Sequence, residues 1–192
     1  MAVRQFAAAH RKTINWASGT STEIFIHPST GSFAARDFIF RISTATVEAE
    51  ESTFTLFTGI TRHLMILHGN LELIHEGRYN KLLKPYDQDI FSGEWNTRSK
   101  GKVTDFNLML KGGAGGSLRH ERLKTGTQLR LEAATEFHFI YVASGTAGLE
   151  NGSITNPGDL LWPAASETIM LEAKEDTDLV IIEVSLTGDN QG

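Results

Sequence analysis

The stretch Phe54–Gly69, with the sequence FTLFTGITRHLMILHG, is the part of the chain from which its fold is inferred. Its first residues alternate between apolar and polar side chains, with Phe54 and Leu56 on one face. A nearly continuous apolar run follows and ends at a second glycine. Period-two alternation is typical of β-strands, and glycines mark their ends. We therefore expect two strands here, separated by a bend at Thr58-Gly59.

One arginine, Arg62, lies within the apolar run. Burying a guanidinium without a partner is unfavourable, because an unpaired charge loses its hydration and gains nothing in return. Arg62 therefore either pairs with a carboxylate inside the protein or binds an anionic ligand. Both alternatives are kept open at this point.

The composition excludes several classes of protein. The chain has 192 residues, a net charge of -5 and no cysteine. It is long enough for one large domain or two small ones. An acidic balance argues against a nucleic-acid partner, and the lack of cysteine excludes disulfides and thiolate metal sites. Because the sequence shows neither a signal peptide nor an apolar segment of membrane-spanning length, we expect a cytoplasmic protein without a membrane partner.

Short strands separated by turn residues recur along the chain, and no helical period is sustained. This pattern predicts an all-β sandwich or barrel. The chain also repeats itself: residues 63–69 resemble residues 139–145, and Pro85-Tyr86-Asp87 has a counterpart in Pro157-Gly158-Asp159. The repeat resembles the cupin barrel occurring twice. The predicted fold class is thus all-β, a bicupin with two cupin-type barrels, or double-stranded β-helix halves, in one chain.

The predicted domain organisation follows from the repeat. We expect an N-terminal cupin-like half at residues 1–111 and a C-terminal cupin-like half at 117–192, packed as a single compact unit. The glycine-rich stretch Lys111–Ser117 lies between them and is either a flexible loop or a hinge.

The metal-binding positions of cupins can be checked in this sequence. Many cupins bind a metal through a His-x-His pair, a glutamate seven residues before the strand-ending glycine, and a later histidine. The glutamate position holds Arg62 in the first half and His138 in the second. The histidine-pair positions hold Thr55 and Phe57, and Leu131 and Ala133. We therefore expect no metal and no other cofactor, and we interpret His138 as a core histidine with its hydrogen bonds satisfied.

Five sequence pieces, in order over about residues 14–111, resemble the HutD/Ves family of bicupin-like proteins. They are Trp16 with Gly19 and Thr22–Ile24; Asp37–Ala45; Phe54–Gly59 with Arg62; Leu83–Pro85 with Phe91; and Thr104–Met109. The chain departs from the family pattern in a shorter loop after Trp16 and in Lys111, where an arginine is common. The resemblance implies a link to histidine utilisation or stress responses, and a small-molecule sensor with formylglutamate as one proposed ligand.

Alternation also predicts which polar side chains share a face. Arg41 and Ser43 lie on one face of the strand at 37–47, and Asp105 and Asn107 on one face of the strand at 104–110. We expect these residues and Arg62 to line the first barrel. Two guanidiniums with hydroxyl and amide groups suit a carboxylate ligand. The alternative is a purely structural ion-pair network of Arg62 or Arg41 with Asp105.

The leading functional hypothesis is non-catalytic binding or sensing of a small carboxylate metabolite, with a regulatory role in histidine or amino-acid utilisation. The expected ligand-binding residues are Arg41, Ser43, Arg62, Asp105, Asn107, Trp16 and Glu23, and none is assigned as catalytic. Apart from a small organic acid, a homodimer partner is left open.

Two alternatives to this hypothesis remain. One is an isomerase or hydrolase that uses Asp105 as base and Arg41 and Arg62 as substrate anchors. It ranks second because arginines beside a carboxylate are expected to lower its pKa and weaken it as a base. The other is a structural protein with a vestigial pocket.

Overall fold

The computed structural model describes residues 3–186. In these residues the chain is built from strands, with a single short 3-10 turn, η1 (Ala8–His10). The all-β prediction is therefore confirmed. The chain forms two compact units: the N-terminal unit is Arg11–Ala114, and the C-terminal unit is Met1–His10 with Gly115–Gly192.

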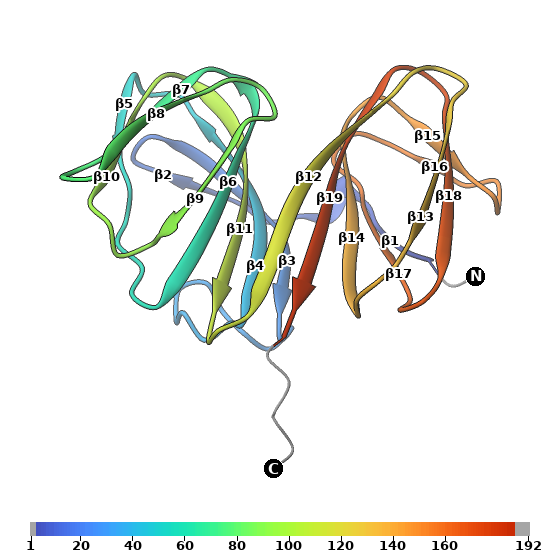
Figure 1. Cartoon of the computed structure of the whole chain (residues 1–192), viewed down its shortest axis with the longest axis horizontal. Coiled ribbons are helices and arrows are strands. Elements are labelled where there is room, and N and C mark those ends of the chain that lie inside the picture. The colour runs from blue at the N-terminus through green and yellow to red at the C-terminus, as the bar shows by residue number, and fades with distance from the viewer. Residues whose placement is uncertain (1–2, 187–192) are drawn as a thin grey trace, which may run out of the picture. The chain divides into compact units, whose positions relative to one another are not determined.

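The N-terminal unit contains one six-stranded and one four-stranded sheet, in the orders β2-β3-β4-β11-β6-β9 and β5-β10-β7-β8 (Figure 1). All of their strand pairs are antiparallel. The strands are β2 (Thr13–Trp16), β3 (Gly19–His27), β4 (Phe40–Val47), β5 (Glu51–Thr53), β6 (Ile60–Gly69), β7 (Leu71–His75), β8 (Tyr79–Leu83), β9 (Gln88–Ser92), β10 (Thr97–Lys100) and β11 (Val103–Lys111).

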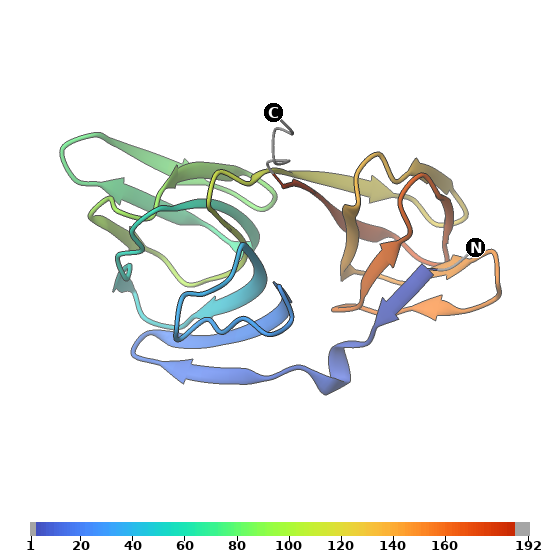
Figure 2. The ribbon, with the colours of Figure 1, turned by 90° about the horizontal axis from the view of Figure 1, so that it is seen from below.

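The C-terminal unit contains a five-stranded sheet, β1-β17-β14-β19-β12, and a four-stranded sheet, β13-β18-β15-β16. Its strands are β1 (Val3–Phe6), β12 (Gly115–Leu123), β13 (Gln128–Glu132), β14 (Phe137–Ser144), β15 (Ala147–Leu149), β16 (Ile154–Thr155), β17 (Leu160–Pro163), β18 (Thr168–Ala173) and β19 (Thr177–Ser185). Within each unit the strands curl around a common interior (Figure 2).

The internal repeat seen in the sequence is present in the backbone. Strand β6 pairs with β11 and β9, and β14 occupies the same position between β19 and β17. In β6, the backbone of Ile66 exchanges hydrogen bonds of 2.6 and 3.0 Å with residues 86–87. In β14, Val142 exchanges hydrogen bonds of 2.7 and 3.0 Å with residues 158–159. The two Pro-x-Asp turns thus close equivalent corners of the two units.

The interiors of the two units differ. In the C-terminal unit an aliphatic cluster contributed by β12, β14, β15, β17, β18 and β19 fills the interior. In the N-terminal unit the comparable cluster includes Leu64, Ile66, Leu73 and Phe91, while buried arginine, aspartate and asparagine side chains occupy neighbouring positions on the same sheet. This sheet therefore carries the candidate site.

Residues 3–6 do not lie in the predicted N-terminal half at residues 1–111. Strand β1 forms the edge of a C-terminal sheet, with Val3 opposite Pro163 and Phe6 opposite Leu160 (Figure 2). The sequence of a four-residue strand does not indicate that it pairs with a strand so distant in the chain. The expectation that both halves pack into a single compact unit stays a prediction.

The predicted strand at the start of the Phe54–Gly69 stretch is absent: residues 54–57 are irregular and connect β5 to β6. Their backbone makes isolated hydrogen bonds instead of a ladder, from Phe54 to Thr97 O (2.9 Å) and from Phe57 to Gly93 O (2.7 Å). The alternation prediction was wrong here because it cannot distinguish a strand from an extended loop that turns both aromatic rings inward.

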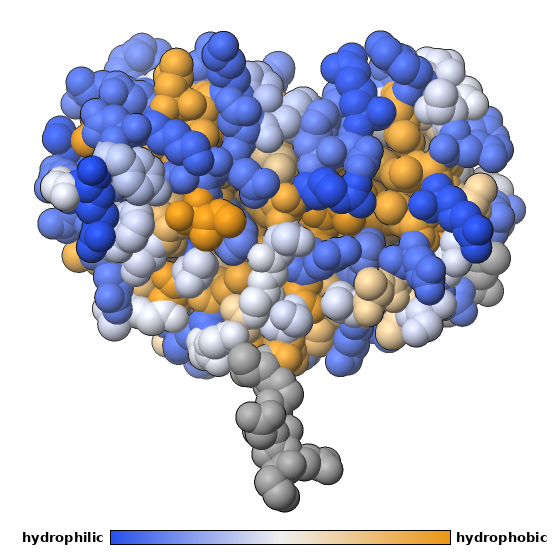
Figure 3. Space-filling view, viewed as in Figure 1, coloured by the Kyte–Doolittle hydropathy of each residue, from blue (hydrophilic) through white to orange (hydrophobic). Residues whose placement is uncertain are grey.

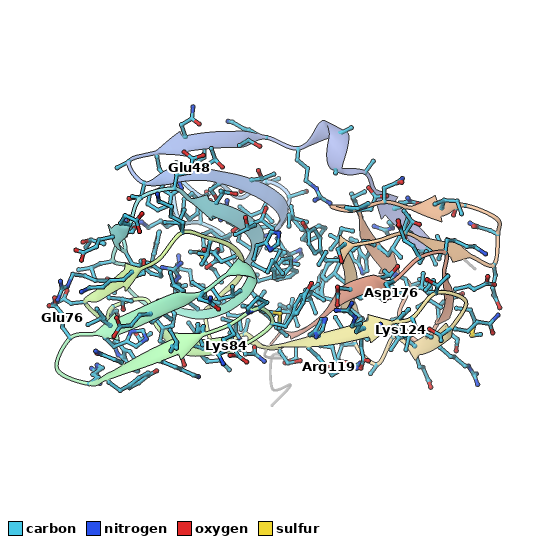
Figure 4. The ribbon with its side chains drawn as sticks, turned by 90° about the horizontal axis from the view of Figure 1, so that it is seen from above. Glu48, Glu76, Lys84, Arg119, Lys124 and Asp176 are labelled. Carbon is cyan, nitrogen blue, oxygen red and sulfur yellow. The ribbon has the colours of Figure 1, made fainter. Side chains whose placement is uncertain are left out.

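Hydrophilic residues cover much of the visible surface of each unit, with hydrophobic residues between them (Figure 3). In the C-terminal unit, Asp176 accepts hydrogen bonds from Lys124 Nζ at 2.7 Å and from the Thr125 backbone at 3.1 Å (Figure 4). The hydrogen bond from Lys124 is the main reason that the pKa of Asp176 falls to about 2. No helix among residues 3–186 has the length and apolar character needed to cross a membrane.

Candidate functional site

A cavity of about 180 Å³ lies in the N-terminal unit. Its wall is formed by strands β2, β3, β4, β5, β6 and β11 and by the loop at residues 54–57. The buried polar residues of the wall are Arg41, Ser43, Ser52, Arg62, Asp105 and Asn107, and the less buried Ser21, Thr53 and Thr55 also line the cavity. Because buried polar groups require hydrogen-bond partners, this group of buried side chains must bond to one another or to a molecule in the cavity.

Strand register brings these polar side chains together. On β11, Met109 pairs with both Arg41 of β4 and Arg62 of β6. Two residues away on β11, Asn107 pairs with Ser43 of β4. Since residues directly opposite in a ladder point to the same face, both arginines and the amide face the same side of the sheet. The predicted common face is thus present in the structure, while ligand binding by these residues stays a prediction.

Both guanidiniums are buried, and Arg62 is the one without an ion pair among residues 3–186. The residue is 8% exposed, and its Nη2 donates a 3.0 Å hydrogen bond to Asn107 Oδ1. Its buried Nε has no hydrogen-bond partner. The guanidinium carbon lies 4.7 Å from the ring centre of Phe54 and 5.4 Å from that of Phe91. Burial lowers the pKa of Arg62 to about 10, so the side chain is still a cation at neutral pH.

Arg41 is held more completely. Its Nε donates to Glu23 Oε2 and its Nη1 to Ser43 Oγ, both at 2.8 Å. Its guanidinium carbon also lies 4.1 Å from the ring centre of Phe33. Burial lowers the pKa of Arg41, and the ion pair with Glu23 opposes that shift. Glu23 therefore balances the charge of Arg41, whereas Arg62 has no comparable ion pair among residues 3–186.

Asp105 corrects one expectation and bears on one alternative. It is 3% exposed and accepts a short hydrogen bond from Asn107 Nδ2. Burial raises its pKa to about 7, although Arg62 and Asn107 act in the opposite direction. The expected lowering was wrong, because the loss of hydration outweighs the field of Arg62. The alternative of an ion pair between Asp105 and Arg62 or Arg41 is not found as a direct contact among residues 3–186, because Asn107 bonds both Arg62 and Asp105 and Glu23 pairs with Arg41.

The rest of the wall is apolar and aromatic. It includes Ile14, Trp16, Phe33, Phe54, Phe57 and Met109. Trp16 lies on the edge strand β2 and is 37% exposed, so its ring forms part of the wall while remaining accessible to solvent. Apolar walls with a few convergent polar groups are typical of small-molecule sites.

Six of the seven predicted ligand residues line this cavity, and the seventh, Glu23, contacts it through Arg41. Sequence reasoning missed Phe33 and Ser52. Phe33 comes from the loop between β3 and β4, for which the sequence offers no face to assign. Phe54 and Phe57 were predicted to be strand residues, and their place on the cavity wall was not predicted.

The described residues contain no cluster of three or more histidine, cysteine, aspartate or glutamate side chains that could hold a metal. His75 is engaged elsewhere: its Nδ1 is 2.8 Å from Thr97 Oγ1 and its Nε2 is 3.0 Å from Asp89 Oδ2. The absence of a metal from this protein stays a prediction.

His138, the C-terminal counterpart of Arg62, is buried as expected, but its hydrogen bonds are not satisfied. Neither ring nitrogen has a hydrogen-bond partner, and Nδ1 lies 3.6 Å from Glu183 Oε1. Burial lowers the pKa of His138. The expectation of a satisfied core histidine was therefore wrong, because Glu183, the nearby carboxylate among residues 3–186, lies beyond hydrogen-bond distance of the ring.

Known proteins resemble this chain in sequence and structure. A curated relative, the uncharacterized 21.2 kDa protein in the hutC 3' region of Pseudomonas putida, is 36% identical over 76 residues, which are 38% of this chain and 40% of that protein. The match thus spans less than half of the relative.

The full chain resembles several solved structures. A conserved protein of unknown function from Pseudomonas aeruginosa PAO1 has a TM-score of 0.79 at 22% identity, covering 97% of this chain and all (100%) of that one. HutD from Pseudomonas fluorescens SBW25 has a TM-score of 0.71 at 19% identity, covering 96% and 100%. At these identities the likeness shows the fold alone.

The same holds for a cupin 2 conserved barrel domain protein from Leptotrichia buccalis, with a TM-score of 0.58 at 17% identity, covering 94% of this chain and 98% of that one. Together with the repeated strand order, these neighbours confirm the bicupin prediction. The HutD sequence profile matches residues 8–181, which is most of the chain. This protein belongs to the HutD family.

Proposed function

We propose that the N-terminal unit binds a small carboxylate, with Arg62 as its principal contact. The observation that carries the proposal is the state of the Arg62 side chain. It is a buried cation on the wall of a cavity, its Nε lacks an acceptor among residues 3–186, and its Nη2 donates a hydrogen bond to a neutral amide.

A carboxylate in the cavity would supply what Arg62 lacks. Planar guanidinium and carboxylate groups form two parallel hydrogen bonds, and such charge-assisted bonds are stronger than neutral ones. Each contributes about 1.5–3 kcal/mol. Arg41 is already oriented by Glu23 and Ser43, so a ligand that also reaches Arg41 would lose little side-chain entropy there.

The proposed role is non-catalytic sensing in histidine utilisation. Support for this part comes from membership of the HutD family and from the relative in the hutC 3' region of P. putida. Formylglutamate is the ligand to test first, since the family resemblance suggests it.

Thermal-shift measurements with a library of small acids test the proposal. We expect some acids to raise the melting temperature of the wild type and to lose this effect on Arg62→Met, which keeps an unbranched chain and removes the charge. Arg98→Met is the matched control. Arg98 lies on β10 of the same unit and makes an exposed ion pair with Glu76. If no acid stabilises the wild type, the proposal fails and a structural protein with a vestigial pocket becomes the better account.

A second candidate function is favoured by one observation. Asp105 is a buried carboxyl group on the cavity wall with a pKa of about 7, which suits a general acid or base at neutral pH. This supports an isomerase or hydrolase in which Arg41 and Arg62 anchor the substrate. Turnover assays over small acylated amino acids, with wild type and Asp105→Asn, would separate catalysis from binding.

A further inference from the structure

Asp105 is the acidic member of a short chain of polar groups on the cavity wall. Asn107 accepts a hydrogen bond from Arg62 and donates one to Asp105, so the amide separates the two charges. The ladder neighbours of Asp105 on β4 and β6 are Ala45 and Ile66, which carry no charge.

Few other charges act on this group. The field on Asp105 comes from Arg62 of β6, and Arg41 of β4 in turn acts on Arg62. Glu23 of β3 is paired with Arg41. The β5 residues on the wall are Ser52 and Thr53, and both are uncharged. The ionised form of Asp105 thus depends on one cation and one amide.

We propose that Asp105 takes up a proton when an anionic ligand binds beside Arg62, so that the cavity binds an acid as anion plus proton. This inference rests on the proposed function. The ionised ligand and the ionised aspartate would compete for the field of the same arginine, and the protonated aspartate removes that competition.

The direction of the effect follows from two changes on binding. The ligand carboxylate neutralises Arg62, which is the charge that favours ionised Asp105, and it also adds a like charge nearby in a site of low dielectric. Both changes raise the pKa of Asp105 above the value of about 7 that it has in the free protein. Above that pH, binding must be accompanied by proton uptake.

This coupling also separates classes of ligand. An anion without a positive group binds with proton uptake and loses affinity as the pH rises. A zwitterion that directs its ammonium group toward Asp105 would instead pair with the ionised carboxylate and bind without uptake. The affinity for acids without a positive group should therefore fall with rising pH, whereas the affinity for such amino acids should not.

Isothermal titration calorimetry of the wild type with N-formyl-L-glutamate, glutarate and formate tests this. Titrations at about pH 8, where most Asp105 carboxyl groups of the free protein are ionised, give the number of protons exchanged when they are run in phosphate and in Tris, which differ in ionisation enthalpy. We expect uptake approaching one proton for at least one acid, and an affinity that falls by up to about tenfold per pH unit above pH 7.

Asp105→Asn is the matched variant, because an amide donates a hydrogen bond as the protonated carboxyl group does but does not titrate. Its complexes should show no proton uptake and an affinity that is independent of pH in the same range. If the acids bind the wild type without uptake, the inference is overturned while the proposed function stands, and this holds whether or not the variant folds. If none of the acids binds, the proposed function fails and the inference with it.

Discussion

Arg62 and Asp105 lie on the same wall of the cavity, and the contact between them runs through Asn107. The amide oxygen of Asn107 accepts from Arg62 Nη2 at 3.0 Å, and its nitrogen donates to Asp105 Oδ1. A direct ion pair would neutralise the charge of Arg62 and occupy its hydrogen-bond donors. With an amide between them, Arg62 keeps hydrogen-bond donors for a ligand. The pKa of Asp105 stays near neutral pH, at about 7.

The raised pKa of Asp105 predicts a specific dependence of stability on pH. In the unfolded chain the group titrates near its ordinary value of 3.8, and in the folded protein at about 7. Between these values the folded state holds the proton and the unfolded state does not, so stability falls as the pH rises. The slope is at most about 1.4 kcal/mol per pH unit, and the effect levels off above pH 7.

Denaturant unfolding of wild type and Asp105→Asn over this range isolates the contribution. The free energy of unfolding of the wild type, minus that of the variant, should decrease from about pH 5 to pH 7 and then stay constant. A difference that grows with pH would mean that ionised Asp105 stabilises the fold, contrary to the burial argument.

Two equivalent glycines, Gly69 at the end of β6 and Gly145 directly after β14, should both resist substitution. Gly69 and Gly145 have φ angles of 85° and 74°, and an added Cβ would lie 2.4 Å from Lys102 O and 2.3 Å from Asp176 O. Gly69→Ala and Gly145→Ala should each lower the free energy of unfolding by more than about 1 kcal/mol.

Gly77→Ala serves as the control for this pair. Gly77 has a similar φ of 73°, but nothing lies within 4 Å of an added Cβ. Its substitution should therefore cost only the backbone term, about 1 kcal/mol. Equal costs at all three positions would show that the close approach to the neighbouring strand has no energetic weight.

Much of this site could be predicted from the sequence because a strand has a period of two. That period places Arg41 and Ser43 on one face of β4 and Asp105 and Asn107 on one face of β11, and the pairing of these two strands puts all four side chains on the same side of the sheet. The repeat at residues 63–69 and 139–145 was readable for the same reason.

What the sequence could not supply depends on distances across the fold. The partner of Arg41 is Glu23 and not Asp105, which follows from the register of β3 against β4 and its bulge between Glu23 and Phe25. The pKa of Asp105 moves upward because burial outweighs the nearby cation, and the extent of burial is a property of the packed unit. The pairing of β1 with β17 is a contact between opposite ends of the sequence.

Purified protein should contain no tightly bound transition metal. The position that other cupins give to a metal-binding glutamate holds the cation Arg62, whose charge would repel a metal ion, and His75 is engaged by Thr97 and Asp89. Elemental analysis of untagged, dialysed protein should find far less than one equivalent of iron, manganese or zinc. A stoichiometric metal that survives dialysis would refute this prediction.

The most direct test of the central claim is a crystal structure of the wild type with the acid that gives the largest thermal shift. The account predicts a carboxylate in the cavity of the N-terminal unit, within hydrogen-bond distance of the Arg62 guanidinium and including its Nε. An acid bound elsewhere, with Arg62 still bonded only to Asn107, would contradict it.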